Sequence, residues 1–361
     1  MADLRFAMFG AHFWARFQLG AWYEFPEAKC VALYNRTVSK AEKLAAEFGV
    51  PAVYGDAEEL LAKEKLDFVD ICTDVFSHQR FTEMVVRHKL PVICQKPMGP
   101  SLEVAQQMVR TCREAGVPFY IHENWRWQHP IRAFKKILDE GTIGTPFRAR
   151  LTMVSGFPVF INEPALKDWE EFILWDMGTH ILDVARFLFG EADRLYCQVH
   201  QIHRDIKGED IATVMMHMGG KTTVTCELGY AENYLEHDRF PETFMFVEGD
   251  KGSAELGPDF WIRVTTKEGT CSRRCPPPSF KWADPDYMVV HSSIVPCIGN
   301  LLGALKGDAP AENTGDDNLK TIVLTSAAYE SARTGTTIDL KAAEEAAARA
   351  RMLPSRRVDA T

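Results

Sequence analysis

The stretch LRFAMFGAHFWA, residues 4–15, decides the fold of the first third of this chain. Leu4–Phe9 is a short apolar run, Gly10 ends the run, and residues typical of a helix follow from Phe13 to Tyr23. An apolar run of this length predicts a buried strand, and a glycine directly after it predicts a tight turn. The stretch therefore predicts a strand, a turn and a helix in direct succession.

The turn has the layout of a phosphate-binding turn in a dinucleotide fold. In such a fold the first Gly makes the tight turn, a second Gly lets the backbone approach the pyrophosphate, and a third small residue allows close helix–strand packing. Gly10 and Ala15 fit the first and third positions, but His12 stands at the second. The match is degenerate, and an ordinary strand–helix turn is the alternative. On the dinucleotide interpretation, the cofactor-binding residues here are Gly10, Ala11, His12, Phe13 and Trp14.

The rest of the first third repeats the alternation of strand and helix. Strands are predicted at Cys30–Tyr34, Phe68–Cys72, Pro91–Cys94 and Phe119–Ile121. Helices are predicted at Ser39–Phe48, Gln79–Arg87 and Leu102–Ala115. Strands that alternate with helices predict a doubly wound parallel sheet, so we expect residues 1–124 to form a Rossmann domain of the α/β class.

The pattern changes after about residue 125. Helices are predicted at Ile131–Asp139, 175–190, Ile294–Leu305 and Asn318–Arg333. Strands are predicted at Phe147–Val154, Leu195–Gln201, Ile211–Met218, Thr222–Leu228, Thr243–Glu248 and Trp261–Thr266. Consecutive strands with short turns predict a mostly antiparallel sheet. Residues 125–340 are therefore expected to form an α+β domain, and residues 341–361 a C-terminal tail rich in Ala, Glu and Arg.

Composition limits the partners and the compartment. The chain has 361 residues, a net charge of −9 and 46% apolar residues. The acidic balance argues against nucleic acid or an anionic membrane as the main partner. We find no signal segment and no apolar run that approaches the roughly 20 residues of a membrane-spanning helix. Most cysteines lie beside apolar residues, as Cys72 and Cys94 do, which is typical of buried thiols in a reducing cytoplasm.

The end of the second predicted strand, Tyr34-Asn35-Arg36-Thr37, bears on the choice of cofactor. NAD-binding folds commonly have an Asp or Glu here that binds the adenosine ribose. Asn35 is neutral and does not repel a 2′-phosphate, and Arg36 is able to pair with one. The pattern therefore favours NADP over NAD, and the alternative is a solvated surface arginine.

The segment Cys94-Gln95-Lys96-Pro97 ends a buried parallel strand. Ligands of open α/β sheets bind at the carboxyl ends of the strands, so we expect Lys96 to lie in the crevice with the nicotinamide. A lysine that extends into solvent is the alternative. We assign Gln95 and Lys96, together with Thr73 and His78 after the preceding strand, to the cofactor site.

A helix at 175–190 carries Asp176, His180 and Asp183 among mostly apolar residues. Offsets of four and three residues place these side chains on one face of an α-helix. Apolar neighbours shift the pKa values of such groups, which suits proton transfer, and the two carboxylates are able to orient the imidazole. A structural histidine is one alternative. A metal bound by Asp176 and His180 is another, but no third ligand is visible, so we expect none.

The segment His122-Glu123-Asn124-Trp125-Arg126-Trp127 follows the last strand of the first domain. It is expected to face the crevice between the domains, unless it forms the core of the domain junction. Aromatic rings beside a few polar groups suit a carbohydrate. We therefore assign Asn124, Trp125 and Arg126 to the substrate site, together with Lys96, Asp176 and His180.

Taken in order, these motifs resemble those of the Gfo/Idh/MocA oxidoreductases, named for glucose–fructose oxidoreductase, inositol dehydrogenase and a rhizopine-catabolism protein. The likeness covers residues 4–335. It is carried by the Rossmann-like head, by Gln95-Lys96-Pro97 at the family's Glu-Lys-Pro motif, by the helix with Asp176, His180 and Asp183, and by a terminal helix ending Ala328-Tyr329-Glu330-Ser331-Ala332. The resemblance implies a Rossmann domain and an open-faced, mostly antiparallel sheet, through which the chains form homodimers or homotetramers.

The resemblance also implies roles for single residues. Lys96 would contact the substrate hydroxyl and the nicotinamide ribose, Asp176 would position the substrate, and His180 would be the general acid/base. The stretch from Asn124 to Trp127 is similar to a subgroup of bacterial sugar dehydrogenases that includes D-apiose dehydrogenase-like proteins. The catalytic residues are thus expected to be Lys96, Asp176 and His180.

Two positions depart from the family pattern, because His12 replaces a usual Gly and Gln95 replaces the usual Glu. Each change is compatible with altered cofactor placement, weak binding or lost dehydrogenase activity. The leading hypothesis is a dehydrogenase that oxidises a sugar or polyol hydroxyl with NADP or NAD, with His180 as general base and Lys96 stabilising the alkoxide. One alternative is an NAD-assisted glycoside lyase or hydrolase with tightly bound cofactor. Another is a non-catalytic NAD(P)-binding sensor.

Overall fold

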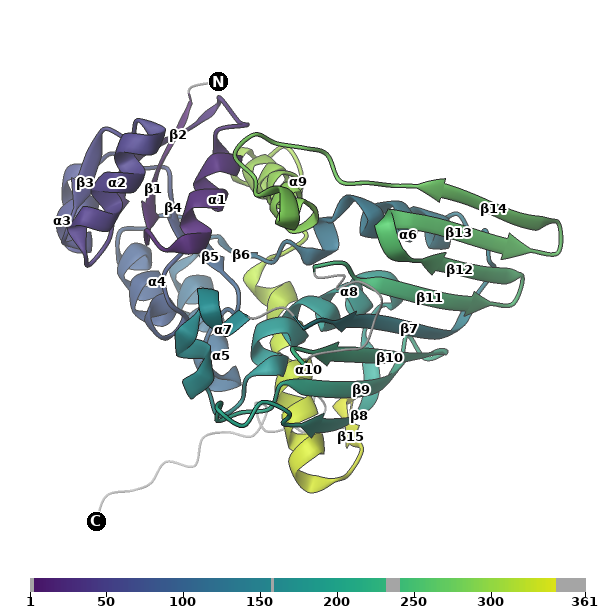
Figure 1. The fold of residues 1–361 in the computed structure, drawn as a ribbon. Coiled ribbons are helices and arrows are strands. Elements are labelled where there is room, and N and C mark those ends of the chain that lie inside the picture. The colour runs from purple at the N-terminus through teal and green to yellow at the C-terminus, as the bar shows by residue number, and fades with distance from the viewer. Residues whose placement is uncertain (1–2, 157–158, 232–240, 342–361) are drawn as a thin grey trace, which may run out of the picture.

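The computed structural model describes residues 3–156, 159–231 and 241–341, which form two β-sheets with helices packed on them (Figure 1). One sheet has six strands and the other has nine. The six-stranded sheet is parallel, and the nine-stranded sheet is mostly antiparallel. This arrangement confirms the predicted fold class.

The six-stranded sheet has the order β3-β2-β1-β4-β5-β6. Its strands are β1 (Leu4–Phe9), β2 (Ala28–Tyr34), β3 (Ala52–Tyr54), β4 (Phe68–Ile71), β5 (Val92–Gln95) and β6 (Phe119–His122). Helices cover both faces, so the central strands are buried on both sides and read as continuous apolar runs. The order reverses at β1, and the carboxyl ends of β1 and β4 therefore flank the crevice in which such sheets bind ligands.

Two groups of helices cover the parallel sheet. One face packs on α1 (Phe13–Trp22), α2 (Val38–Phe48) and α9 (Met288–Lys306), and the other on α3 (Ala57–Lys63), α4 (His78–Arg87) and α5 (Leu102–Ala115). Helix α9 belongs by sequence to the second half of the chain, yet it lies beside α1 in Figure 1. Its Ile294, Ile298 and Leu301 are buried in one cluster with Phe6 and Phe68. The first core is therefore completed by a segment far downstream of residue 124.

Helix α9 also corrects an expectation about apolar length. The span Pro285–Lys306 is long and apolar enough to cross a membrane by length and composition alone, whereas the sequence was expected to contain no such run. Polar residues at His291, Ser292 and Ser293 divide the run in the sequence. Just over half of an 18-residue apolar stretch of this span is buried inside the fold, as expected of a core helix.

The nine-stranded sheet has the order β14-β13-β12-β11-β7-β10-β9-β8-β15. Its strands are β7 (Pro146–Val154), β8 (Ala192–His200), β9 (Ile211–Met218), β10 (Thr222–Gly229), β11 (Phe244–Gly249), β12 (Gly252–Leu256), β13 (Trp261–Thr266), β14 (Gly269–Arg274) and β15 (Ile338–Asp339). Neighbouring strands pair antiparallel except β7 and β10, which are parallel. Helices α6 (His129–Asp139), α8 (Thr179–Phe189) and α10 (Gly315–Thr334) pack on one face. Along β9, exposed and buried residues alternate, so the other face is open.

Some elements were not predicted from the sequence, namely β3, α3, β12, β14, β15 and the short helix α7 (Val159–Asn162). They are short, or they carry too few apolar residues to show a period. Residues 342–361, most of the expected C-terminal tail, lie outside the described residues.

Candidate active site

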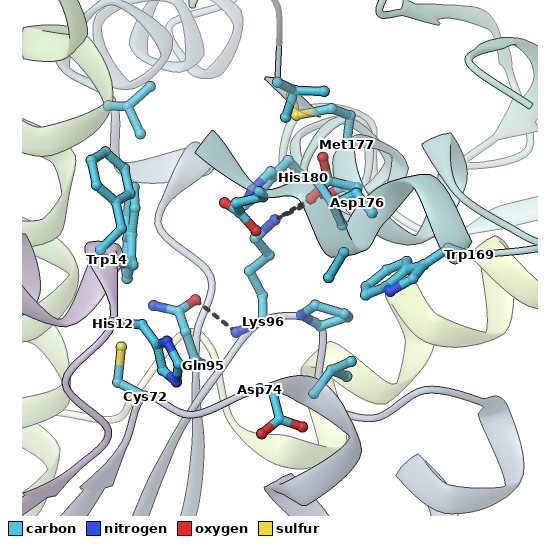
Figure 2. Close-up of a pocket in the computed structure, with 18 of the residues that line it drawn as sticks. His12, Trp14, Cys72, Asp74, Gln95, Lys96, Trp169, Asp176, Met177 and His180 are labelled. Atoms are coloured by element: carbon cyan, nitrogen blue, oxygen red, sulfur yellow. Dashed lines mark hydrogen bonds and ion pairs between the residues drawn. The ribbon is translucent and has the colours of Figure 1, made fainter. Parts of the chain in front are cut away.

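A cavity of about 540 Å³ lies between the carboxyl ends of the parallel strands and the start of α8. Many of the predicted site residues line it, namely His12, Phe13, Trp14, Thr73, Gln95, Lys96, Asn124, Trp125, Asp176 and His180. Figure 2 shows His12 and Trp14 on one side of this cavity, with Lys96 extending toward Asp176 and His180 on the other. The structure thus brings together the strand-end lysine and the mid-chain histidine.

Lys96 directly follows β5 and reaches across the cavity to the second domain. Its Nζ lies 3.1 Å from the backbone oxygen of Asp176 and 3.1 Å from Oδ1 of the same residue. Burial lowers the pKa of Lys96, but the negative charges of Asp176, Glu123 and Glu163 outweigh it and raise the pKa overall. Lys96 is therefore a fixed positive charge at neutral pH.

Asp176 lies in a π-helical turn, η4 (Leu174–Gly178), that leads directly into α8. The expectation of one regular α-helix over 175–190 is therefore wrong for its first turn. The wider turn presents both the carbonyl and the carboxylate of Asp176 to Lys96. Single π-turns within helices are frequent at functional sites. The residue pattern of this segment does not predict one.

His180 is almost fully buried on α8, and its ring is fixed from two sides. Nδ1 lies 2.6 Å from Oε1 of Glu123, and the indole of Trp125 stacks on the imidazole at 4.4 Å between centroids. Burial and the charge of Lys96 hold the pKa of His180 well below its ordinary value. The ring is therefore neutral, and Nε2 is the nitrogen left for a ligand in the cavity.

Glu123 was not among the predicted site residues. It follows β6 directly, where the crevice was expected, so its position was a usable signal. Burial raises the pKa of Glu123 to about 7, although a backbone bond from Trp125 and the charges of Lys96 and Arg126 oppose this. The carboxyl group that orients His180 therefore comes from the first domain.

Asp183 and Arg126 take other places than expected. Asp183 accepts hydrogen bonds from the guanidinium of Arg126, with Nε 2.7 Å from Oδ2. Arg126 also pairs with Asp317 at 3.1 Å. Neither Arg126 nor Asp183 lines the cavity, so the structure does not place Arg126 with the substrate residues or Asp183 against the imidazole. The reason is that α8 turns Asp183 toward η2 (Trp125–Trp127), which the sequence spacing alone could not show.

Gln95 is part of a buried chain of amides. Its Oε1 accepts the backbone N–H of Lys96 at 2.7 Å, and its Nε2 donates to Oε1 of Gln18 at 2.7 Å. Gln18 in turn donates to both carboxylate oxygens of Asp70, at 2.7 and 2.8 Å. Burial raises the pKa of Asp70 to about 6. The neutral amide of Gln95 thus fits this row of hydrogen bonds, in which the negative charge lies on Asp70, beyond Gln18.

The turn after β1 has the geometry of an anion site. Gly10 has φ +108°, and a Cβ there would meet the carbonyl oxygen of Cys72 at 2.0 Å, so only glycine fits. Helix α1 has no side-chain cap and no acidic residue in its first turn, which leaves its N–H groups for an anion. His12 has extended backbone (φ −86°, ψ −178°), a conformation that needs no glycine. Its imidazole lines the cavity, and burial lowers its pKa. These groups fit the pyrophosphate of a dinucleotide.

Five predicted cofactor residues, Gly10, Ala11, Asn35, Arg36 and His78, do not line the cavity. Asn35 accepts the N–H of Ala11 at 3.2 Å and donates to Thr37 at 2.8 Å, so it shapes the turn. His78 is buried, with Nδ1 3.1 Å from the carbonyl oxygen of Pro97. Arg36 is exposed and has no ion pair or hydrogen bond with the part of the chain that the structure describes.

The cavity has further walls that the sequence did not reveal, formed by Glu163, Trp169, Tyr230, Tyr287 and His291. Burial raises the pKa of Glu163, and the negative charge of Asp176 adds to this. Burial also raises the pKa of Tyr230 well above its ordinary value. These residues come from three separate segments, so only the tertiary fold unites them.

Comparison with known proteins identifies the same two halves. Residues 4–123 match a family described as "Oxidoreductase family, NAD-binding Rossmann fold", and residues 131–255 match one described as "GFO/IDH/MocA C-terminal domain". The chain is similar to D-apiose dehydrogenase of Rhizobium rhizogenes, with 38% identity over 95% of this chain and 99% of the relative. It is also similar to D-apiose dehydrogenase of Paraburkholderia graminis, with 38% identity over 94% of this chain and 90% of the relative.

A solved structure shares the whole fold. The chain is similar to an oxidoreductase from Agrobacterium radiobacter in complex with NAD+, L-tartaric acid and magnesium, with a TM-score of 0.92 and 37% identity. The match covers 95% of this chain and 100% of that one. The two sheets therefore belong to one shared fold.

Proposed function

The chain belongs to the Gfo/Idh/MocA family of oxidoreductases, and from this premise we propose that it oxidises a hydroxyl group of a neutral sugar with a nicotinamide dinucleotide. One observation carries the proposal: Lys96, Asp176 and His180 meet in one cavity that also reaches the N-terminus of α1. An ammonium, a carboxylate and an imidazole within reach of one hydroxyl are the groups that alcohol oxidation needs. The name of the relatives at 38% identity favours D-apiose or a similar sugar as the substrate.

In this mechanism the residues divide the chemistry between them. When bound, the nicotinamide supplies the carbon that accepts a hydride. His180 takes the hydroxyl proton at Nε2, because Nδ1 is held by Glu123. Lys96 stabilises the negative charge that develops on the substrate oxygen. Asp176 holds the Lys96 ammonium and offers its carboxylate to a second hydroxyl.

The test is a sugar panel read by the absorbance of the reduced cofactor, with wild type and His180→Ala. We expect kcat of the variant to fall by about 10²–10⁴, the range for loss of a general base. His88→Ala, an exposed histidine that pairs with Glu58, is the control and keeps wild-type kcat. Full activity of His180→Ala would refute the assigned role.

Two other functions lead to different observations. A lyase or hydrolase with tightly bound cofactor would form product without consuming added NAD(P) in proportion. A non-catalytic sensor would bind cofactor without turnover. A protein whose cofactor site has degraded would show no rise in melting temperature with NAD, NADP or the reduced form of either. The anion site at α1 and the fixed charge of Lys96 support the dehydrogenase.

For the cofactor we propose NADP in preference to NAD. The support is the absence of an acidic side chain at the end of β2, Tyr34-Asn35-Arg36-Thr37, and the exposed guanidinium of Arg36, which is able to bind a 2′-phosphate. The Agrobacterium relative was solved with NAD+, so affinities for both cofactors are the decisive measurement.

We propose that the chain forms homodimers or homotetramers through the open face of the nine-stranded sheet. Met215, Phe246 and Trp261 are exposed on this face at 49%, 39% and 46%. Light scattering of the wild type and of Phe246→Lys tests the assembly. We further propose a cytoplasmic location, because all nine cysteines are unpaired and eight are buried.

A further inference from the structure

The carboxyl group of Glu123 and the imidazole of His180 form a buried, hydrogen-bonded pair beside the cavity. Oε1 of Glu123 lies 2.6 Å from Nδ1 of His180, and neither side chain is more than 4% exposed. Oε1 also accepts the backbone N–H of Trp125 at 3.0 Å. Oε2 is buried without a hydrogen-bond partner among the described residues. A carboxylate with one unpartnered buried oxygen is costly, and it becomes less costly when it takes up a proton.

We propose that Glu123 and His180 act together as a proton relay in which the imidazole stays neutral. Glu123 receives the proton that His180 gives up from Nδ1. The proposal rests on the proposed dehydrogenase function and adds a residue to it. Before oxidation, Glu123 is a carboxylate and accepts the Nδ1–H of His180, so Nε2 has a free lone pair. After oxidation, Glu123 is a carboxylic acid that donates to Nδ1, and Nε2 carries the proton.

The balance of the step is simple. The substrate O–H bond breaks, its proton forms the new N–H bond at Nε2, and the Nδ1 proton moves to Oε1 of Glu123. The electron pair of the substrate C–H bond leaves as a hydride, which the oxidised nicotinamide accepts. The products are a carbonyl group, a reduced nicotinamide and a protonated Glu123. The pair then resets in reverse: Nδ1 takes the proton back from Glu123, and Nε2 releases its proton to solvent in the cavity that His180 lines.

The electrostatics of the pocket favour this route over an imidazolium. Burial and the positive charge of Lys96 both hold the pKa of His180 low, so a doubly protonated ring is unfavourable there. Burial raises the pKa of Glu123 to about 7, so its acid and its carboxylate are close in free energy near neutral pH. The Nδ1 proton therefore moves to Glu123, where it removes a buried negative charge, and the His180 ring stays neutral.

The surroundings of the pair hold its geometry. Trp125 stacks on His180 and is itself anchored by Nε1, which donates to the hydroxyl of Thr243 at 2.9 Å. The other titratable or charged groups around the pair are Lys96 after β5, His122 on β6, Arg126 on η2, Asp176 on η4, Asp183 on α8 and Cys297 on α9. Lys96 is the cation that penalises a charge on the ring, and Arg126 is neutralised by Asp183.

The test uses the full-length protein, with histidine labelled by ¹⁵N and the His180 signals assigned from His180→Gln. The expected result is a tautomer change: Nδ1 is protonated at high pH, Nε2 at low pH, and imidazolium is absent between pH 6 and 8. In Glu123→Gln, the amide oxygen keeps the bonds from Trp125 N–H and Nδ1–H, so Nδ1 stays protonated throughout. Formation of imidazolium in wild type over this range would overturn the proposal.

Kinetics give the second readout. Glu123→Gln should lower kcat for oxidation at least tenfold, leave KM within threefold, and remove the inflection near pH 7 from the pH profile of kcat. Asp183→Asn, which removes another buried carboxylate from α8, should keep that inflection. An unchanged profile in Glu123→Gln would overturn the relay. If wild type oxidises no sugar but the tautomer change is seen, the proposed function fails and the pair stands.

Discussion

Replacement of Arg126 by Met tests the energetics of the contact that joins η2 to α8. Arg126 is 7% exposed and Asp183 is 0% exposed, and they form two hydrogen bonds. Without Arg126, Asp183 keeps the Thr321 hydroxyl at 3.2 Å and Nη1 of Arg186 at 3.8 Å. Breaking a buried ion pair by removing one partner costs about 3–5 kcal/mol, because a buried charge is left uncompensated. For a domain of this size, the melting temperature should fall by roughly 6–20 °C.

The matched variants make this reasoning falsifiable. Arg126 keeps Asp317 and Glu312 when Asp183 becomes Asn, so Asp183→Asn should cost less, about 1–3 kcal/mol. The double variant should be more stable than Arg126→Met alone, because it no longer holds a buried carboxylate that has lost its two hydrogen bonds from Arg126. Thermal unfolding of all three variants is the assay. Simple addition of the two single effects would refute the account.

The pH dependence of the Arg126→Met deficit has a definite sign. Burial already raises the pKa of Asp183, and Arg126 opposes this, so its removal raises the pKa further. A carboxyl group with a raised pKa in the folded state binds a proton more readily when folded, so its penalty applies above that pKa. The deficit should therefore be smaller at pH 5 than at pH 8. Arg148→Met is the control, because its pair with Glu248 is exposed and surface ion pairs contribute little to stability.

Three further predictions concern the predicted cofactor residues and Lys96. Gly10→Ala should lower the free energy of unfolding by at least about 1–3 kcal/mol and weaken cofactor binding, because its Cβ would meet the Cys72 carbonyl. The control Gly49→Ala should lower it less, because that Cβ meets nothing within 4 Å, and equal melting temperatures of the two variants would contradict this. Arg36→Glu should weaken NADP at least about tenfold in titration calorimetry and NAD less than about threefold, and equal losses would exclude a 2′-phosphate contact. Lys96→Met should lower kcat by about 10²–10³, since the developing alkoxide loses its cation; steady-state rates near wild type would show that another group stabilises it.

The parallel sheet could be predicted because its strands are buried on both faces and stand out as apolar runs between helices. Lys96 could be placed in the crevice because it follows β5 directly, and His180 because apolar residues flank it. The partner of His180 could not be predicted from local spacing, because Glu123 lies 57 residues away and only the packing of η2 on α8 joins them. The π-turn at Asp176 has no residue signature, and the pairing of Asp183 with Arg126 depends on the direction in which α8 presents each side chain.

The return of α9 to the first sheet has a consequence for synthesis on the ribosome. Residues 1–124 leave the exit tunnel long before residues 288–306 are made. The apolar surface around Phe6 and Phe68 therefore stays partly exposed until α9 packs on it. A gene fragment that stops at residue 124 would encode a sheet with one side partly bare, prone to aggregate rather than to bind dinucleotide. Domain swaps within this family should therefore carry α9 along with the N-terminal half.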